Sequence, residues 1–227
     1  MLLRVLHCLE TARDVSRCAV SIDQPALLET VPELAAQLQS GRLARHQSLH
    51  SVSRSVADAL DQLDLNSGPV FVTTADHALL TPEMVDHSTA SADQSDADLL
   101  VGLVSKTLIR ARYPDTTRTY IPLRGESWSG ANLFVFRTPA ARRAAEFWVR
   151  AERHRKRPWR LAGAIGYTAL LRFALRRLDL DAAFADLSRA TGCRIAPLRL
   201  PFAEAAIDVD RPSDLELAEQ ILAARRV

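Results

Sequence analysis

Strand-like and helix-like segments alternate along this chain, and that alternation restricts the possible folds more than any other feature. The apolar runs "CAVSID" (18–23), "PVFV" (69–72) and "LLVGLV" (99–104) are separated by segments with helical periodicity. Strands that alternate with helices favour an α/β fold with a largely parallel sheet. Near-continuous apolar strands fit a sheet that is buried on both faces. We therefore expect a three-layer α/β/α sandwich.

The periodicity and the turn signals divide the rest of the chain. Thr81-Pro82-Glu83 is a strong helix start, because it combines an N-cap hydroxyl, a proline at the first helical position and an acid in the first turn. We expect the other helices at 1–12, 32–40, 55–65, 139–178 and 212–225, and further strands at 117–123, 130–138 and 193–200. The polar stretch 45–55 has no strand pattern and is expected to connect two elements.

Composition limits the domain count and the class of protein. A chain of 227 residues, 48% hydrophobic and 25% charged, can bury one large core, so we expect a single domain over 1–227 with a helical, acceptor-side subregion at 139–190. No window approaches the roughly 18 apolar residues of a membrane span, and a net charge of +2 argues against a nucleic-acid partner. Three cysteines without metal-ligand spacing indicate reduced thiols, and we expect a cytoplasmic protein.

An acidic residue follows one of the predicted strands. In "PVFVTTADHALL", Asp76 and His77 come where the strand ends, and ligands of open α/β sheets bind at the carboxyl ends of strands. An acid there can meet a metal ion or a polar ligand. The plain alternative, in which Asp76 is only a turn residue and His77 a surface imidazole, is about equally well supported by this pattern.

A second acidic segment lies near the C-terminus. In "AAIDVDRPSDL", Asp208 and Asp210 are two positions apart, so both side chains point the same way if the segment is extended. Together with an acid near position 76 they could bind a hard divalent cation, Mg²⁺ or Mn²⁺, which takes oxygen ligands and often keeps substrate phosphates in its shell. The alternative is that Asp210 caps the following helix and Asp208 is solvated.

With these segments in view, the chain resembles the MobA-like nucleotidyltransferases of the GT-A type. The resemblance rests on "GPVFVTTADHALLTPEMV" (68–85), "IDVDRPSDLELAEQIL" (207–222) and the helix start "SVSRSVADAL" (51–60). It implies a Rossmann-like fold and transfer of a nucleoside monophosphate from a nucleoside triphosphate to a phosphorylated acceptor, with release of pyrophosphate. Arg211, where threonine is usual, is a tolerable departure.

The resemblance also implies roles for single residues. Asp76 would be the first metal ligand, and Asp210, possibly with Asp208, the second. Thr74 and Asp76 would lie on the nucleotide side of the site. Ser53 and Ser55 belong to the helix start that would face the nucleotide base.

One departure from the family pattern is serious. The family's glycine-rich "LAGGxGxRxG" loop, whose backbone N–H groups hold the triphosphate, has no counterpart in residues 1–50. Either the true start lies upstream, which we favour, or the protein is a degenerate relative. The first explanation predicts an exposed strand edge beside residues 69–74, and poor solubility of the 227-residue chain.

Two further segments are candidates for the acceptor side. "RAERHRKRPWR" (150–160) is a solvated helix end, a wall that selects an anionic acceptor, or a contact with an acidic membrane surface, in falling order of preference. We expect catalytic phosphate contacts from Lys156 and Arg157, and acceptor contacts from Arg160. In "ESWSGANLFVFR", Gly130 allows close approach of a ligand and Asn132 offers a donor and an acceptor; a plain edge strand explains this segment about as well.

Two other functions stay open at this point. A GT-A glycosyltransferase would use the same aspartate and metal to hold a nucleotide sugar, although such enzymes usually carry DxD where this chain has "ADH" (75–77). A non-catalytic nucleotide-binding protein would account for the missing loop. An in-frame "LAGG"-like segment upstream would favour the nucleotidyltransferase.

Overall fold

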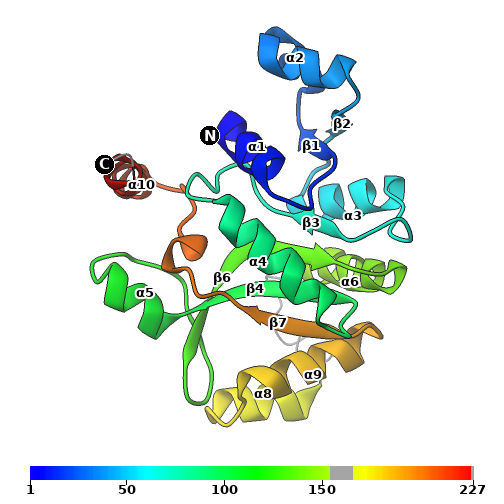
Figure 1. Ribbon diagram of the computed structural model, residues 1–227. Helices are drawn as coiled ribbons and strands as arrows, with labels where there is room; N and C mark the ends of the chain where they lie inside the picture. Colours follow the sequence, from blue (N-terminus) through cyan, green and yellow to red (C-terminus); the bar gives the residue numbers. More distant parts are fainter. Residues whose placement is uncertain (154–165, 226–227) are drawn as a thin grey trace.

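A five-stranded β-sheet forms the middle layer of the fold (Figure 1). The computed structural model describes residues 1–153 and 166–225. The sheet runs in the order β3 (Val70–Val72), β6 (Ser127–Phe136), β4 (Leu99–Ser105) and β7 (Ile195–Arg199), and the short β5 (Ile121–Pro122) pairs with β6. Every strand of this sheet runs the same way except β6, which lies antiparallel between β3 and β4. The expected α/β sandwich is therefore confirmed.

Side chains of β4 enter the core on both faces of the sheet. Leu100 and Val104 join the cluster beneath one helical layer, whereas Leu99 joins the cluster beneath the other. This two-residue alternation explains why the strand is an almost continuous apolar run in the sequence.

Helices cover each face of the sheet. On one face lie α1 (Leu2–Thr11), α4 (Pro82–Asp93) and α5 (Lys106–Arg112), and on the other α3 (Val52–Gln62) and α6 (Arg142–Arg153). The remaining helices are α2 (Pro32–Gln39), α8 (Tyr167–Ala174), α9 (Leu180–Thr191), α10 (Pro212–Ala224) and the 3-10 segments η1 (Pro25–Thr30), η2 (Pro139–Ala141) and η3 (Ala203–Ala206). Among the described residues, no helix is long and apolar enough to cross a membrane.

The edge of the sheet at β3 is open, as expected. β3 pairs with β6 on one side, and no strand of the described chain pairs with its other side. β1 (Cys18–Ile22) and β2 (Leu43–Gln47) form a separate parallel sheet, which lies beyond that edge in Figure 1. The backbone of β3 is thus unpaired along one side, a feature that promotes pairing with other chains.

Local signals placed some elements correctly and missed others. Thr81 caps α4 as predicted, with its side chain accepting a hydrogen bond from the Met84 N–H. β2 was missed because Leu43 alone of its five residues is buried, so this strand carries no apolar run. The predicted strand at 117–123 is reduced to Ile121–Pro122, and the predicted helix at 139–178 is divided into several pieces.

The three cysteines are free, as expected for reduced thiols. Cys8 and Cys193 are buried, whereas Cys18 is partly exposed. Burial raises the pKa of the Cys8 thiol to about 12, so this thiol is protonated at neutral pH.

Candidate active site

A cavity of about 670 Å³ opens beside the N-terminus of α10. It lies between the segment that follows α5, the first half of β6, and the chain that leads into α10. Its lining includes four of the predicted site residues: Gly130, Asn132, Asp208 and Asp210. The two acidic positions and the β6 positions, some 80 residues apart in the sequence, therefore belong to one site.

A β-bulge in β6 aims Asn132 at the acidic segment. The register of β6 against β4 shifts between the pairs Val101↔Phe134 and Leu103↔Gly130, so three residues of β6 oppose one of β4. Asn132 lies in this bulge with φ 50°, a left-handed conformation that is uncommon outside glycine. Its Nδ2 donates to Asp208 Oδ2 at 3.0 Å.

Gly102 makes that bulge possible. A Cβ at position 102 would lie 2.9 Å from the carbonyl oxygen of Leu133 and 3.0 Å from its Cβ. Contacts this short are not tolerated, so the close approach of β4 to β6 requires glycine on β4. Gly130, by contrast, has open space around its Cα, and a Cβ there would meet nothing within 4 Å.

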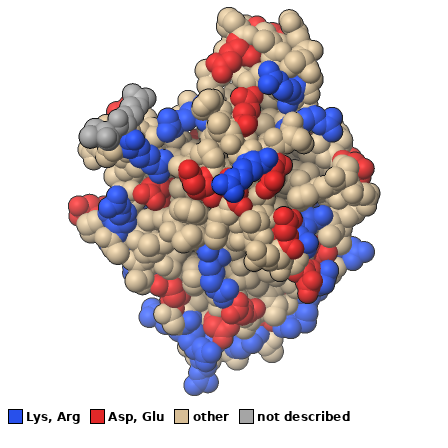
Figure 2. All heavy atoms as spheres, in the orientation of Figure 1, with Lys and Arg blue, Asp and Glu red and all other residues tan. Residues whose placement is uncertain are grey.

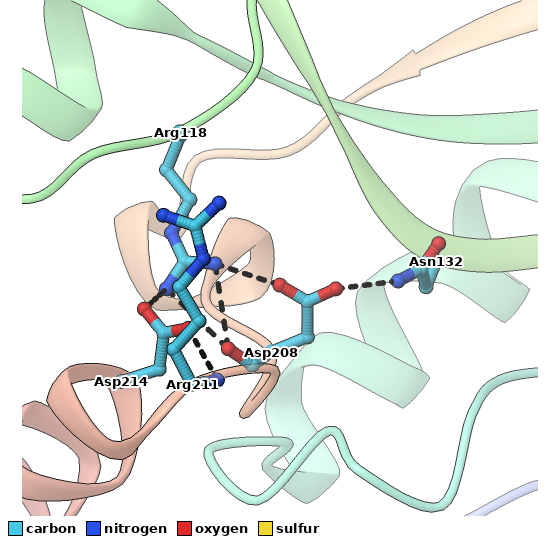
Figure 3. A network of polar contacts seen from close by, with 5 residues as sticks. All are labelled: Arg118, Asn132, Asp208, Arg211 and Asp214. Carbon is cyan, nitrogen blue, oxygen red and sulfur yellow. Dashed lines mark hydrogen bonds and ion pairs between the residues drawn. The ribbon is translucent and has the colours of Figure 1, made fainter.

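Arg118 is the centre of the polar network in the cavity (Figure 3). Its guanidinium binds Asp208 Oδ1 at 2.7 Å and Asp214 Oδ1 at 2.8 Å. The Arg118 side chain is 7% exposed, so these are buried ion pairs rather than surface contacts. Asp214 also accepts a hydrogen bond from the Arg211 backbone N–H at 3.0 Å and so fixes the first turn of α10.

These contacts overturn the plain interpretation of the second acidic segment. Asp208 is not a freely solvated carboxylate, because Arg118 and Asn132 bind its two carboxylate oxygens. Asp210 does not cap α10, because the N-cap residue of that helix is Arg211. Asp210 is exposed and lines the cavity without a cationic partner among the ion pairs of the described residues.

The loop after β3 brings Asp76 to the same region. The Val209 N–H donates to the carbonyl oxygen of Asp76 at 3.2 Å, which joins the two acidic segments directly. Arg4 and Arg225 fix the following residues by donating to the carbonyl oxygens of Ala78 (2.7 Å) and Leu79 (3.1 Å). Asp76 lies beyond the carboxyl end of β3, the strand at the open edge of this sheet.

His77 is a core residue, not the surface imidazole of the plain interpretation. It is 1% exposed, and burial lowers its pKa to about 4. The imidazole is therefore neutral at physiological pH. His77 Nδ1 lies 3.5 Å from the Thr73 hydroxyl, at the limit of a hydrogen bond.

Several buried polar atoms around the site have no partner among the described residues. They include Asp76 Oδ1, Thr74 Oγ1 and Arg118 Nε. Unpaired buried polar atoms are rare in proteins, and they need a physical reason. A buried carboxylate oxygen without a donor is the kind of atom that binds a cation.

Other acidic side chains surround Asp210 and perturb its carboxyl group. Asp208, some burial, and then Asp76 and Asp214 raise the pKa of the Asp210 carboxyl, whereas Arg118 lowers it. The site therefore disfavours the ionised carboxylate of Asp210 in the absence of a further positive charge. Among residues 1–153 and 166–225, no group of three acidic, histidine or cysteine side chains could by itself hold a metal ion. Protein ligands for a cation here would be the two carboxylates of Asp76 and Asp210, which suits an ion such as Mg²⁺ that is completed by water and phosphate oxygens.

The predicted helix start at 51–60 is confirmed, but its serines contact the protein itself. Ser51 caps α3 by accepting from the Arg54 N–H. The Ser55 hydroxyl donates to the Ser51 carbonyl at 3.0 Å and accepts from the Leu49 N–H at 2.8 Å. Ser53 donates to Glu152 of α6. Neither Ser53 nor Ser55 lines the cavity.

The three residues predicted from the basic run, Lys156, Arg157 and Arg160, lie outside the described residues. Arg118 is the site residue that the sequence did not single out. Its segment, "TRTYIPL", was interpreted as a strand, and nothing in it marks the arginine as buried.

Comparison with solved structures identifies a relative. A hypothetical transferase from Thermus thermophilus is 30% identical to this chain, with a TM-score of 0.74, and the match covers 95% of this chain and 85% of the transferase. The chain belongs to the family of this transferase. No model of a protein family matches the sequence, and no curated protein matches it.

More distant structures share the fold of this transferase family. The 4-diphosphocytidyl-2C-methyl-D-erythritol synthase from Anaerococcus prevotii has a TM-score of 0.55 at 10% identity and covers 98% of this chain and 85% of its own. The CMP:2-keto-3-deoxy-manno-octonic acid synthetase, solved in complex with CTP, has a TM-score of 0.54 at 11% identity. The match covers 99% of this chain and 88% of the synthetase. The chain thus shares its fold with this synthase and this synthetase. The narrower MobA-like assignment stays a prediction, because none of these proteins is described as MobA-like.

Proposed function

We propose that this protein is a Mg²⁺-dependent nucleotidyltransferase, with Mn²⁺ as a substitute, that transfers a nucleoside monophosphate from a nucleoside triphosphate to a phosphorylated small molecule and releases pyrophosphate. The observation that carries the proposal is the unpaired Asp76 Oδ1, on a loop bonded to Val209, next in the chain to Asp210, whose pKa is raised by Asp208 and also by Asp76 and Asp214. Membership of a transferase family and a fold shared with cytidylyl-transferring enzymes support the reaction class.

Charge explains how these residues would work. Asp76 and Asp210 would hold the cation, which supplies positive charge against the phosphates as charge builds up on them. Arg118 holds Asp208 between itself and Asn132, and so keeps the acidic segment in place. Thr74 lies two residues before Asp76 with a buried, unpaired hydroxyl, which suits a contact on the nucleotide side.

The acceptor would occupy the cavity beside β6. Gly130 leaves room there, and the carbonyl group of Asn132 can accept a hydrogen bond while its Nδ2 is engaged by Asp208. The Arg211 side chain runs toward Arg118 along the same wall (Figure 3) and forms no ion pair among the described residues. An unpaired guanidinium in the cavity favours an anionic acceptor. Contacts to phosphate from Lys156, Arg157 and Arg160, and from Ser53 and Ser55 to the base, stay part of the proposal.

A binding and release experiment tests this function. The full chain with Mg²⁺ is titrated by calorimetry with ATP, GTP, CTP and UTP, and pyrophosphate release is measured with each triphosphate and a panel of sugar and alcohol phosphates. We expect one triphosphate to bind in a Mg²⁺-dependent way, and one acceptor to stimulate pyrophosphate release. Asp76→Asn should abolish both, whereas Asp96→Asn, an exposed carboxylate between α4 and β4, should leave both unchanged.

Other results would point to the two other functions. Binding of a triphosphate without pyrophosphate release from any acceptor would indicate a non-catalytic binding protein. Turnover of a nucleotide sugar without pyrophosphate would indicate a glycosyltransferase. Equal binding by the wild type and Asp76→Asn would contradict the assignment of Asp76.

A further inference from the structure

Helix α8 turns its apolar side to solvent. Four large apolar side chains of α8 and its C-cap residue recur at i, i+3, i+4 and i+8, the spacing of one helical face: Tyr167, Leu170, Leu171 and Leu175. They are 75%, 46%, 60% and 56% exposed, in that order. These four residues, with exposed Ala174 between them, are called the α8 stripe below.

The opposite side of α8 is attached to the protein through a polar contact. Ala169 is buried, and Arg172 Nη2 binds Asp186 Oδ2 of α9 at 2.5 Å. The Asp186 side chain is 4% exposed, so this ion pair is anchored in the protein and fixes the rotation of α8. The exposure of the α8 stripe follows from this attachment, because a helix held by its polar side must present its apolar side outward.

Positive charge accompanies the α8 stripe. Arg176 and Arg177 follow it directly and are both exposed. The acids of the neighbouring α9 region are already paired: Asp179 with Arg124, Asp181 with Arg199, and Asp186 with Arg172 and Arg189. Within the described segment 166–178 there is no Asp or Glu, whereas there are three arginines, Arg172, Arg176 and Arg177. Lys and Arg side chains, with some Asp and Glu among them, are prominent at the lower end of the molecule, where α8 lies (Figures 1 and 2).

The apolar side chains and the exposed arginines together indicate which kind of partner the α8 stripe can bind. A second copy of this chain, docked stripe to stripe, would bring Arg176 and Arg177 of both copies together, and like charges at an interface are unfavourable. An anionic lipid surface satisfies both features, because acyl chains accept the apolar side chains and acidic head groups attract the arginines.

We propose that the α8 stripe, with Arg176 and Arg177, binds the protein to the surface of an anionic membrane. The helix lies along the interface and does not span it. This inference is independent of the proposed nucleotidyl transfer, since none of these residues lines the cavity. The two regions are nevertheless connected: the Arg124 N–H, in the hairpin that carries the cavity residue Ile121, donates to the carbonyl oxygen of Leu178 at 2.8 Å. The membrane-bound protein would therefore hold that hairpin close to the lipid head groups.

Co-sedimentation with lipid vesicles tests the proposal. The full chain is mixed with vesicles of phosphatidylcholine alone, and with vesicles that also contain phosphatidylglycerol. We expect binding to the anionic vesicles that is at least tenfold stronger than to the neutral ones and that weakens in 0.5 M salt, since surface charge is screened within about 3 Å at 1 M and 10 Å at 0.1 M.

Matched variants separate the stripe from general effects. Leu171→Glu and the double change Arg176→Glu with Arg177→Glu should each lower binding at least tenfold. Leu27 in η1 has a similar exposure, 52% against 60% for Leu171, and Leu27→Glu should have no effect. All these side chains are exposed, so the variants should keep the wild-type unfolding temperature, which is measured alongside.

Three outcomes would overturn the proposal. The first is absence of binding to anionic vesicles. The second is equal loss of binding in Leu171→Glu and Leu27→Glu. The third is a concentration-dependent dimer, seen by analytical ultracentrifugation and removed by Leu171→Glu, without vesicle binding, which would assign the α8 stripe to self-association.

Discussion

Replacement of Arg118 by methionine should destabilise the fold far more than the loss of an ordinary ion pair. Methionine keeps much of the side-chain volume but leaves the carboxylates of Asp208 and Asp214 without their cation. Removing one partner of a buried pair costs about 3–5 kcal/mol. The side chains of Asp208 and Asp214 are 24% and 12% exposed, so water can solvate part of their unpaired charge and reduce the loss of stability. We expect the lower end, about 3 kcal/mol, which corresponds to a fall of roughly 6–12 °C in unfolding temperature for a chain of this size.

Urea unfolding at pH 7 measures this cost, and the chain offers a matched control. Arg13 pairs with Asp86 at 3.5 Å but is 86% exposed, so Arg13→Met should change the free energy of unfolding by no more than about 0.5 kcal/mol. A double-mutant cycle of Arg118→Met and Asp214→Asn should show a coupling energy of about 1–3 kcal/mol. If Arg118→Met costs no more than Arg13→Met, or if the coupling energy is near zero, the network of Figure 3 does not hold the acidic segment in place.

Two further predictions concern the frame of the site. Gly102→Ala should lower the free energy of unfolding by about 1–3 kcal/mol, because the new Cβ would displace Leu133 from the bulge. Gly130→Ala adds a Cβ that meets nothing within 4 Å, and it should change the free energy of unfolding by less than about 0.5 kcal/mol. Equal effects of the two changes in urea unfolding would contradict the role given to Gly102. The wild type should also lose stability as pH falls from 6.5 toward 4, because His77 binds a proton in the unfolded chain near pH 6.5 but in the folded protein only near pH 4. His77→Leu should weaken the dependence of the free energy of unfolding on pH between 6.5 and 4. An unchanged dependence would show that His77 binds protons as readily in the folded protein as in the unfolded chain.

Local sequence signals predicted the parts of the site that depend on local structure. The proline-led start of α4 and the apolar run of β3 are properties of consecutive residues, and they fix where Asp76 lies in the chain. The same holds for Asp208 and Asp210, whose short spacing brings both to the cavity wall. Asn132 was predicted as a site residue together with Gly130, which lies two positions before it in the sequence. The glycine that permits the bulge, however, is Gly102 on the adjacent strand β4.

Long-range contacts explain what the sequence did not reveal. Arg118 is buried because it meets Asp208 and Asp214, 90 and 96 positions away, and no local pattern encodes such pairs. The position of β6 between β3 and β4 is likewise set by pairing among strands far apart in the chain. The exposure of the apolar face of α8 also depends on a long-range contact, because Arg172 on the opposite side of the helix binds the buried Asp186 of α9.

The central claim is that Asp76 and Asp210 together hold a divalent cation, and a direct Mn²⁺ titration tests it. Electron paramagnetic resonance of the free ion gives the dissociation constant for the full chain without nucleotide. The account predicts one Mn²⁺ site per chain that Asp76→Asn and Asp210→Asn each weaken at least tenfold and that Mg²⁺ competes for, with Asp96→Asn as an unaffected control. Mn²⁺ binding that is unchanged in both Asp76→Asn and Asp210→Asn would contradict the account.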